Sequence, residues 1–285
     1  MSALSLTGKA RLAGVIGWPV DHSRSPALHG FWLREHGIDG AYLPLAVRPE
    51  ALKAALAGLA ALGFRGANVT VPHKETTLSL VDRASDTALR IGAVNTITVA
   101  EDGTLEGNNT DAFGFLENLR EAQPGWRAAT GAAVVIGAGG AARAIAVALA
   151  NEGAPEIRIV NRTRERADRL VQEIGRPLVA IDWANREAAL ADASLLVNAT
   201  TQGMSGEQPL DLDLARLPAN ALVNDIVYVP LETGLLVSAR ARGNKTVDGL
   251  GMLLHQARPG FAAWFGIEPK VTPALREAVL ASRTG

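Results

Sequence analysis

Three polar side chains interrupt and end an apolar stretch near residue 70. The segment NVTVPHK, residues 68–74, combines β-branched residues with Asn68, Thr70 and Lys74. A strand that only filled a core would not need an amide, a hydroxyl and an amine at its end. A positioned amine can stabilise charge on a reacting oxygen and can carry a proton. The segment is therefore a candidate for ligand recognition and chemistry.

Two serines stand between the first expected strand and the first expected helix. The segment DHSRSPALH contains Ser23 and Ser25, followed by Pro26 at a plausible first helical position. Taken alone, the segment favours simple capping, with Ser25 as the N-cap residue and Ser23 as a solvated turn residue. Hydroxyls at a helix N-terminus can also hold a carboxylate, so both interpretations stay open.

More polar groups follow in GAVNTI, GNNTDAFGF and GMLLHQA. These segments supply Asn95, Asn109, Thr110, Asp111 and Gln256. Asn109 or Thr110 could cap the helix that follows, which would explain one or two of these groups but not the set. The simplest interpretation of Gln256 is a surface glutamine on an amphipathic helix.

The strongest local motif is VVIGAGGAARA, which follows an expected strand and opens an expected helix. Gly137 permits a tight turn, Gly139 lets the backbone approach a pyrophosphate, and Ala142 lets helix and strand pack closely. The helix N-terminus would offer free N–H groups to the phosphates. A tight turn without a ligand is the alternative, but the context favours a dinucleotide.

The next strand ends in IVNRTRERA, which lacks the acid that an NAD site usually places there. Asn161 is followed by Arg162, Thr163 and Arg166, groups that would bind a ribose 2′-phosphate. Thr163 is also expected to cap the helix. The alternative is a solvated arginine-rich helix face, but the missing acid and the cations together favour NADP.

The elements that must position these residues alternate between strand and helix. Strands are expected at residues 11–17, 41–47 and 66–72 and helices at 25–37 and 49–63, with a hairpin of 95–100 and 103–109. A second series has strands at 132–140, 156–162, 177–182, 193–200, 221–230 and 244–249 and helices at 141–153 and 163–175.

This order predicts an α/β protein of two domains. Residues 1–109, completed by residues 250–285, would form a substrate-binding and catalytic domain with a mostly parallel sheet. Residues 110–249 would form a Rossmann-type NADP-binding domain. The stretch 121–131, with its proline and glycines, is a credible link, and the helical tail 250–282 is expected to pack back on the first domain. A cleft between two α/β units is a common ligand location.

Composition narrows the possible partners. The 285 residues carry a net charge of −1, which gives no electrostatic sign of nucleic acid or membrane binding. The first apolar run is too short for a signal or membrane segment. Cysteine is absent, as suits a cytoplasmic protein. His22, His29 and His73 lack metal-ligand spacing, so no metal is expected.

Taken together, the chain resembles the shikimate dehydrogenase family. The segments that carry the resemblance occur in the family's order and cover nearly the whole chain: HSRSP, NVTVPHK, GAVNT, NNTD, GAGGAARA, NRT, NATTQGM, DIVYVP and DGLGMLLHQA. Each segment alone is weak, whereas the ordered set is highly specific. The resemblance implies the same two-domain fold and a catalytic pair formed by Lys74 and Asp111.

The resemblance also implies the binding residues. The substrate set is Ser23, Ser25, Asn68, Thr70, Lys74, Asn95, Asp111, Tyr228 and Gln256. The cofactor set is Gly137, Ala138, Gly139, Gly140, Ala141, Asn161, Arg162, Thr163, Arg166, Thr200, Met204, Ile226 and Gly249. Gly251 also matches a position near the nicotinamide.

The expected activity is the reversible, NADP-dependent reduction of 3-dehydroshikimate to shikimate in aromatic amino-acid biosynthesis, by a monomer or homodimer. Two rival enzymes share the fold, a quinate/shikimate dehydrogenase and an aminoshikimate-type dehydrogenase. A rival of another class is a non-catalytic NADP-binding sensor. Such a sensor would have no need for Lys74 together with Asp111.

Overall fold

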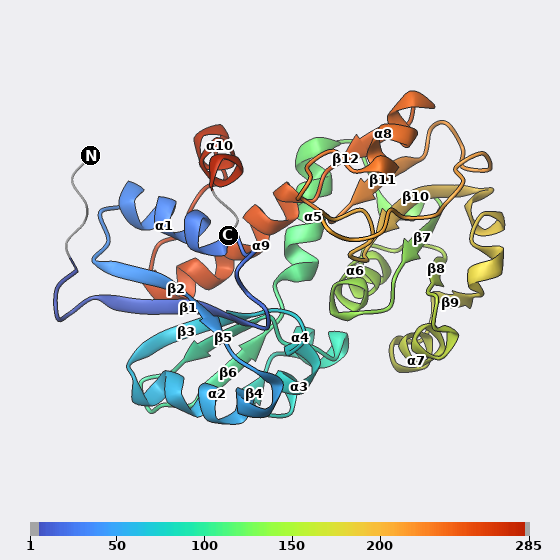
Figure 1. Cartoon of the computed structure of the whole chain (residues 1–285). Coiled ribbons are helices and arrows are strands. Elements are labelled where there is room, and N and C mark those ends of the chain that lie inside the picture. The colour runs from blue at the N-terminus through green and yellow to red at the C-terminus, as the bar shows by residue number, and fades with distance from the viewer. Residues whose placement is uncertain (1–5, 283–285) are drawn as a thin grey trace. The chain divides into compact units, whose positions relative to one another are not determined.

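The chain folds into two compact units, as a computed structural model of residues 6–282 shows. The first unit combines the described residues up to Thr110 with those from Leu253 onward, and the second unit spans Asp111–Met252. The second unit is therefore an insertion within the first. The first unit is built from the two segments of the chain that precede and follow this insertion (Figure 1).

The first unit holds a mixed sheet between two layers of helices. Its elements are β1 (Arg11–Gly17), α1 (Ser25–Glu35), β2 (Gly40–Ala46), α2 (Leu52–Ala61), β3 (Phe64–Val69), α3 (Lys74–Leu78), β4 (Arg83–Ala84), α4 (Asp86–Ile91), β5 (Thr96–Val99), β6 (Leu105–Asn108), α9 (Leu250–Phe265) and α10 (Pro273–Ala281). A short 3-10 turn at Pro49–Ala51 leads into α2.

The first sheet has the strand order β2-β1-β3-β5-β6-β4. β1 runs parallel to both β2 and β3, as the predicted βαβαβ order requires. β5 and β6 form the predicted antiparallel hairpin, and β5 also runs antiparallel to β3, which makes the sheet mixed. Figure 1 shows α1, α9 and α10 on one side of this sheet and α2 on the other. The predicted α/β class is confirmed.

The C-terminal helices pack on the first unit, as predicted. Trp264 of α9 donates its indole N–H to the carbonyl of Ile97 in β5 at 2.9 Å, and Trp32 of α1 donates to the carbonyl of Lys270 at 3.0 Å. Gly66 in β3 makes room for Trp264, because a Cβ there would lie 2.2 Å from the indole nitrogen. The same Cβ would lie 2.0 Å from the Ile97 oxygen, so only glycine permits this approach.

The second unit is a Rossmann-type α/β unit. Its main elements are α5 (Asp111–Ala122), β7 (Ala132–Ile136), α6 (Gly140–Asn151), β8 (Ile157–Val160), α7 (Arg164–Ile174), β9 (Leu178–Ile181), β10 (Ala193–Asn198), β11 (Leu222–Asp225), α8 (Gly234–Ala241) and β12 (Lys245–Val247). Short 3-10 turns lie at Ala128–Thr130, Trp183–Asn185 and Ala188–Leu190.

The second sheet is entirely parallel, with the order β12-β11-β10-β7-β8-β9. Residues of β7 alternate between its faces: Ala133 and Val135 pack in a cluster with α5 and α6, while Val134 and Ile136 pack in a cluster with α8. The order of the strands reverses between β7 and β10. The carboxyl ends of strands at such a reversal are where open α/β sheets bind nucleotides.

The proline- and glycine-containing stretch 121–131 does not separate the two units. It joins the end of α5 to β7 inside the second unit, and the chain divides at Thr110 and Asp111 instead. The interpretation of this stretch as the link was wrong because α5 packs with the second unit, where Phe115 and Leu119 are fully buried in its core.

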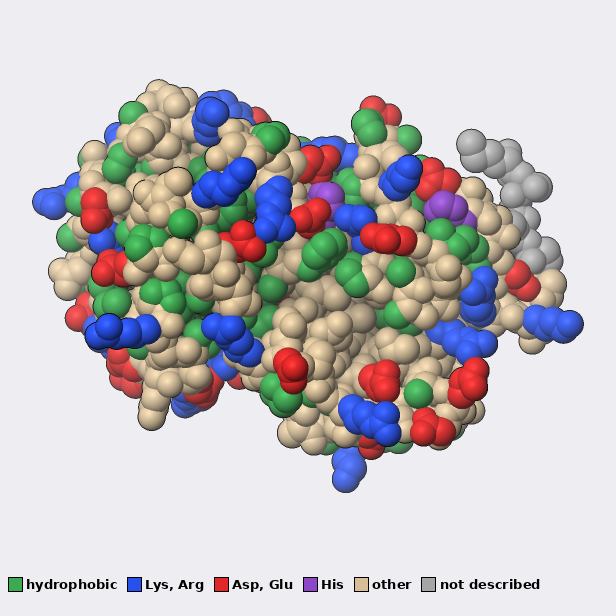
Figure 2. Space-filling model, turned by 180° about the vertical axis from the view of Figure 1, so that it is seen from behind, with side chains coloured by type: hydrophobic (Ala, Val, Ile, Leu, Met, Phe, Trp, Pro, Cys, Tyr) green, Lys and Arg blue, Asp and Glu red, His purple; other side chains and the backbone are tan. Residues whose placement is uncertain are grey.

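Charges of both signs are mixed over the surface, as the net charge of −1 leads one to expect. Figure 2 shows Lys and Arg side chains interspersed with Asp and Glu side chains over the visible face, without a large area of one sign. Within residues 6–282, no helix has the length and apolar character needed to cross a bilayer.

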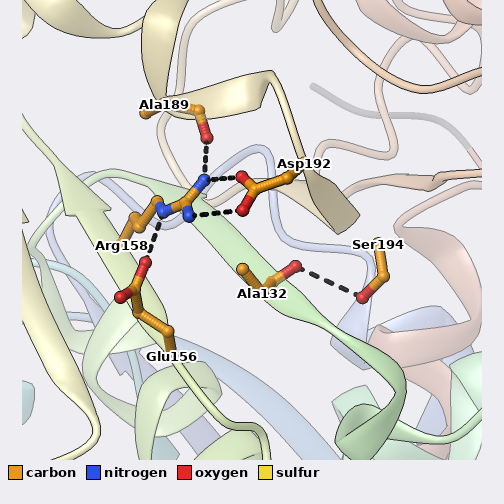
Figure 3. A network of polar contacts seen from close by, with 6 residues as sticks. All are labelled: Ala132, Glu156, Arg158, Ala189, Asp192 and Ser194. Carbon is orange, nitrogen blue, oxygen red and sulfur yellow. Dashed lines mark hydrogen bonds and ion pairs between the residues drawn. The ribbon is translucent and has the colours of Figure 1, made fainter.

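One ion-pair network lies at the amino-terminal end of β8 in the second unit (Figure 3). Arg158 donates two hydrogen bonds to the carboxylate of Asp192, one to Glu156 and one to the carbonyl of Ala189 at 2.7 Å. Its side chain is 15% exposed, whereas that of Asp192 is 69% exposed. The network fastens β8 to the segment before β10, at the opposite end of β8 from the predicted phosphate-binding residues.

Candidate active site

Asn68 lies near the carboxyl end of β3 and is buried, on the face of the sheet opposite to its neighbours Ala67 and Val69. Its side-chain oxygen accepts a hydrogen bond from the hydroxyl of Tyr42 at 2.6 Å. Its side-chain nitrogen donates to the carbonyl of Asn95 and to the hydroxyl of Thr96, each at 3.2 Å. The predicted ligand Asn68 is thus held from three sides by its own unit.

Asn95 is the centre of a buried polar cluster. Its side-chain oxygen accepts from the backbone N–H of Thr110 and from the hydroxyl of Thr96, both at 2.8 Å. Its side-chain nitrogen donates to the hydroxyl of Thr110 at 3.1 Å and to the side-chain oxygen of Gln256 at 3.4 Å. The structure therefore brings the predicted ligands Asn68, Asn95 and Gln256 into one network. Gln256 is buried, so its interpretation as a surface glutamine was wrong.

Ser25 is not the N-cap residue of α1. The helix begins at Ser25 itself, and the N-cap position belongs to Arg24, whose side chain makes no capping bond. Ser23 performs the local role instead, because its hydroxyl oxygen accepts from the backbone N–H of Ser25 at 3.3 Å. The expected capping role of Ser25 was wrong because the helix begins one residue closer to the N-terminus than expected. Ser25 is its first residue and Pro26 its second.

Lys74 and Thr70 flank the turn after β3. Lys74 is the first residue of α3, and its carbonyl accepts from the backbone N–H of Val94 at 2.9 Å. Thr70 donates its backbone N–H to the carbonyl of Ile16 in β1 at 2.8 Å, which fixes its backbone just beyond the carboxyl end of β3. His73 between them is buried, and its ring bonds the carbonyl of Val47 at 2.7 Å.

The substrate set is divided between the units. Asp111 is the first residue of α5 and is 5% exposed, and Tyr228 follows β11, so both belong to the second unit. The other seven members belong to the first unit: Ser23, Ser25, Asn68, Thr70, Lys74, Asn95 and Gln256.

Sequence patterns missed Tyr42 and Thr96, two of the residues that hold the polar cluster together, and indicated Thr110 only as a polar group or possible cap. Tyr42 lies in β2, whose sequence GAYLPLA indicates only an apolar strand, and Thr96 and Thr110 each directly follow a predicted or candidate site residue. The hydroxyls of Thr96 and Thr110 lie 3.2 Å apart. The position of Thr96 directly after Asn95 was the signal that could have pointed to it.

The glycine-rich turn of the second unit leaves space for a pyrophosphate. Gly137 has φ +119° and would bring a Cβ to 3.0 Å from the carbonyl oxygen of Ala199, so the turn requires glycine. Gly139 is the N-cap residue of α6, and no atom lies within 4 Å of the place where its Cβ would stand. No side chain caps α6. The free N–H groups and the open side of Gly139 fit a phosphate.

The arginines after β8 differ in their partners. Arg164 forms ion pairs with Asp168 and Asp182. Arg162 and Arg166 are exposed and make no ion pair or side-chain hydrogen bond among the described residues, which leaves both cations available for an anion. Two exposed guanidinium groups without ion-pair partners within residues 6–282 are compatible with a ribose 2′-phosphate and also with the solvated arginine face named as the alternative.

Thr163 occupies the N-cap position of α7, but its side chain makes no capping hydrogen bond. The expected capping by its hydroxyl was therefore wrong, and that hydroxyl stays available. The Asn161 side chain donates to the carbonyl of Thr163 at 2.8 Å and so holds the turn that carries Arg162.

The loops after β10 and β11 are joined by buried polar groups. Asn198 donates from its side chain to Asp225 at 3.0 Å and to the carbonyl of Gln202, also at 3.0 Å, and accepts from the hydroxyl of Thr200 at 2.7 Å. Asp225 also accepts from the hydroxyl of Thr233 at 2.7 Å. Burial raises the pKa of Asp225, and these hydrogen bonds partly offset the rise. The loop that carries Thr200 and Met204 is therefore fixed to the strand end that precedes Ile226.

Gly249 lies against the backbone of that second loop. A Cβ at this position would lie 2.2 Å from the carbonyl oxygen of Ile226. The predicted cofactor residues Ile226 and Gly249 are thus in direct contact. Among the residues that the structure describes, no group of three or more His, Asp or Glu side chains could hold a metal ion.

An all-parallel sheet of this strand order, with a glycine-rich turn and unpaired arginines after its second strand, defines a dinucleotide-binding α/β protein. The buried amides and hydroxyls of the other unit are suited to a small hydroxylated molecule. Together, the two units have the architecture of a dinucleotide-dependent oxidoreductase.

Two family models match the chain. Residues 15–97 match the shikimate dehydrogenase substrate binding domain, and residues 120–205 match the shikimate/quinate 5-dehydrogenase family. A protein of Paramagnetospirillum magneticum named shikimate dehydrogenase (NADP(+)) is 62% identical over 275 residues, which cover 96% of this chain and all of that protein. The chain belongs to the shikimate dehydrogenase family.

Solved structures agree with this assignment. Shikimate 5-dehydrogenase of Thermus thermophilus, in complex with NADP(H) and shikimate, is 40% identical with a TM-score of 0.83, over 95% of this chain and 98% of that one. Quinate dehydrogenase of Corynebacterium glutamicum, in complex with NAD, is 34% identical with a TM-score of 0.89, over 96% of this chain and 99% of that one.

Proposed function

We propose that the chain catalyses the reversible, NADP-dependent reduction of 3-dehydroshikimate to shikimate, in the pathway to aromatic amino acids. The observation that carries the proposal is the 62% identity, over nearly the whole chain, to a protein named shikimate dehydrogenase (NADP(+)). The proposal is supported by the division into one unit that contains the buried cluster of amides and hydroxyls and one Rossmann-type unit. The first unit is the substrate-binding and catalytic domain, and the second is the NADP-binding domain.

The substrate is held by the amides and hydroxyls that the first unit keeps in place. Ser23 and Ser25 bind its carboxylate at the start of α1. Asn68, Thr70, Asn95 and Gln256 surround its ring and hydroxyls, and Tyr228 lines the same pocket. The support is the buried network, which fixes Asn68, Asn95 and Gln256 before any substrate arrives. Fixed polar groups lose little conformational entropy on binding and reject molecules that leave them unpaired.

Lys74 and Asp111 form the catalytic pair. As hydride reaches the ketone carbon, negative charge develops on the oxygen, and the protonated amine of Lys74 stabilises that charge and donates the proton. Asp111 orients the amine, and in the reverse direction Lys74 accepts the proton of the shikimate hydroxyl. Two hydrogen bonds support this pairing. The Lys74 carbonyl accepts from the N–H of Val94, and the side-chain oxygen of the next residue, Asn95, accepts from the N–H of Thr110, which precedes Asp111.

NADPH supplies the hydride when it is bound. The turn of Gly137, Ala138, Gly139, Gly140 and Ala141 holds the pyrophosphate, and Asn161, Arg162, Thr163 and Arg166 hold the 2′-phosphate. Thr200, Met204, Ile226 and Gly249 line the nicotinamide end. The support is the open side of Gly139 and the absence of ion-pair partners for Arg162 and Arg166 within residues 6–282.

We further propose a cytoplasmic location, where NADPH and the substrate are both available, and a monomer or homodimer. Size-exclusion chromatography with light scattering would test the oligomeric state. Neither proposal changes the residue roles above.

Steady-state kinetics of the purified protein would test the function. Shikimate and quinate are each oxidised with NADP and with NAD, and the absorbance of the NADPH or NADH that forms is followed. We expect the highest kcat/KM with shikimate and NADP. A preference for quinate with NAD, the pair suggested by the structure of the Corynebacterium glutamicum relative, would overturn the proposal. No turnover with any pair would favour an NADP-binding sensor.

A further inference from the structure

Tyr42 connects β2 to the substrate-binding network, although no chemistry has been assigned to it. Its side chain is buried, and its hydroxyl lies 2.6 Å from the side-chain oxygen of Asn68. Among the described strands, β2 pairs only with β1, on the opposite side of β1 from β3, so this bond crosses the middle strand. It is the contact that joins the edge of the sheet to Asn68.

The partners of Asn68 fix which end of its amide faces which group. The carbonyl oxygen of Asn95 can only accept, so the amide nitrogen must point toward it. The amide oxygen then faces Tyr42, whose hydroxyl must donate. Both amide hydrogens are engaged, one by Asn95 and one by Thr96. The oxygen has two lone pairs, and Tyr42 uses one of them.

We propose that Tyr42 is a positioning residue that holds Asn68 as a hydrogen-bond acceptor for a hydroxyl of the substrate. The hydroxyl of Tyr42 occupies one lone pair of the amide oxygen and keeps the amide from rotating. The second lone pair then receives a proton from a ring hydroxyl. The inference rests on the proposed function, since it deepens the role given there to Asn68.

The surroundings of Tyr42 keep its ring and its proton in place. His29 of α1 stacks on the ring with 3.9 Å between the centroids and 6° between the planes, and Trp264 of α9 packs against it at 6.0 Å. Burial raises the pKa of Tyr42 well above its usual value, with a smaller opposing effect from a hydrogen bond of Ser25. The phenol therefore keeps its proton at neutral pH and can act as a donor.

The acceptor role has a consequence for specificity. A substrate hydroxyl can donate to the amide oxygen, whereas a ketone, an ether or a fluorine at the same ring position cannot. Such a group would leave the oxygen of Asn68 without its second partner and would repel it. At one ring position other than the reacting carbon, the site therefore distinguishes a substrate that carries a hydroxyl from one that carries a group able only to accept hydrogen bonds.

The test is the Tyr42→Phe variant, which keeps the ring on His29 and removes only the hydroxyl. Shikimate kinetics with NADP are compared between wild type and variant. The same comparison is made with the two shikimate analogues that each lack one non-reacting hydroxyl. Trp32→Phe is the matched control, because it also removes one hydrogen bond, a partly buried one, from a ring beside His29 but leaves Tyr42 and Asn68 untouched.

We expect Tyr42→Phe to raise the KM for shikimate about 3- to 10-fold, the effect of one hydrogen bond, with kcat and the KM for NADP nearly unchanged. The rise should vanish with one deoxy analogue and persist with the other. Trp32→Phe should leave the KM for shikimate within about twofold of wild type.

Three results would overturn the inference: an unchanged KM in Tyr42→Phe, an equal rise in Trp32→Phe, or a rise that persists with both deoxy analogues. The last would indicate an effect through Ser25 or through general loosening. If wild type fails to oxidise shikimate, the proposed activity is wrong. In that case the affinity for shikimate is measured by calorimetry in wild type and Tyr42→Phe, which tests the role of Tyr42 separately from the activity. Equal affinities, or no binding to either protein, would overturn the inference.

Discussion

The two units prepare their polar groups in opposite ways. In the first unit, Asn68, Asn95 and Gln256 are buried and bonded to one another through threonine hydroxyls before any ligand is present. In the second unit, Arg162 and Arg166 are exposed and have no ion-pair partner among the described residues. One unit thus holds its proposed binding groups in hydrogen bonds, and the other leaves its proposed binding groups exposed and without ion pairs to the described residues.

The difference follows from what each unit is proposed to bind. A neutral hydroxyl is recognised only by groups that already point correctly, because each single hydrogen bond contributes about 0.5–1.5 kcal/mol. A phosphate carries charge and several acceptor oxygens, so exposed guanidinium groups can gain charge-assisted bonds with it in several geometries. Variants in the first unit should therefore act through geometry, and variants in the second unit through charge.

The largest effect is expected for the proposed catalytic pair, whose loss should lower turnover without weakening cofactor binding. Lys74→Ala should lower kcat by about 10²–10⁴-fold, since the proton donor is lost, while NADP binding changes little. Asp111→Asn should act in the same direction. The measurement is kcat for shikimate oxidation, with cofactor affinity followed by the fluorescence of bound NADPH.

Lys53→Ala is the control for loss of a lysine, because Lys53 is exposed on α2 in the same unit. It should keep full turnover. Near-wild-type kcat in Lys74→Ala would remove its proton-transfer role, and a matching loss in Lys53→Ala would point to a nonspecific effect of charge.

Charge in the second unit should govern the choice of cofactor. Arg162→Ala should weaken NADP binding about 10- to 100-fold, which corresponds to roughly 1.5–3 kcal/mol, and leave NAD nearly unaffected. The reason is that NAD has no phosphate for the guanidinium to bind. The measurement is kcat/KM for both cofactors.

Arg164→Ala provides a matched control two residues away, because Arg164 is already paired with Asp168 and Asp182. It should slightly lower the melting temperature and leave the preference for NADP intact. Equal weakening of NADP and NAD in Arg162→Ala would contradict the proposed 2′-phosphate site, and so would a wild type that prefers NAD.

Acid should affect the two units with opposite signs. His29 in the first unit is completely buried, and burial lowers its pKa from 6.5 to about 3. Below pH 6.5 the unfolded chain binds a proton here that the folded chain lacks, so the free energy of unfolding decreases as the pH falls toward 3. Between pH 7.5 and 5.5 the loss from this residue should be about 1.4 kcal/mol.

His29→Phe should remove this part of the pH dependence, measured by urea unfolding at the two pH values. Trp32→Phe keeps the histidine and should keep the slope. Asp225 in the second unit behaves oppositely: its pKa is raised by burial, so its contribution to stability decreases as the pH rises through that raised value. An unchanged slope in His29→Phe would show that His29 is not the titrating group.

The smallest effect is expected for the ion-pair network around Arg158. Arg158→Lys keeps the charge but cannot bond both oxygens of Asp192, and it should cost about 0.5–1 kcal/mol. That cost should decrease in high salt, and kinetics should not change, because the network lies at the far end of β8 from Arg162. A changed KM for NADP would contradict this separation, which calorimetry and kinetics on the same sample would reveal.

The nucleotide-binding unit could be predicted from local sequence because its determinants are local. The turn from β7 to α6 is determined by nearby residues of the chain: its positive φ requires Gly137, and Ala142 packs inside the core. Which of the arginines is paired could not be predicted, because the partners depend on the tertiary fold: Arg164 pairs with Asp182, which follows another strand.

The substrate-binding unit could be predicted only in part because its determinants are distant in sequence. The strand end with Asn68 was visible, but its partner Tyr42 looked like any residue of an apolar strand. Gln256 looked exposed because its burial depends on Asn95, more than 150 residues away. The start of α1 was misplaced by one residue for a local reason, since Pro26 is tolerated anywhere in the first turn.

The split of the first unit has a consequence for how the protein is made. Trp264, which fills the space above Gly66, and Gln256, which bonds Asn95, are synthesised only after the whole second unit. Chains fold from the N-terminus as they leave the ribosome, domain by domain. The second unit can therefore close its core while the first unit still exposes the apolar surface at Gly66 that Trp264 later covers. A nascent chain that stalls before residue 264 leaves this surface exposed to chaperones or to aggregation.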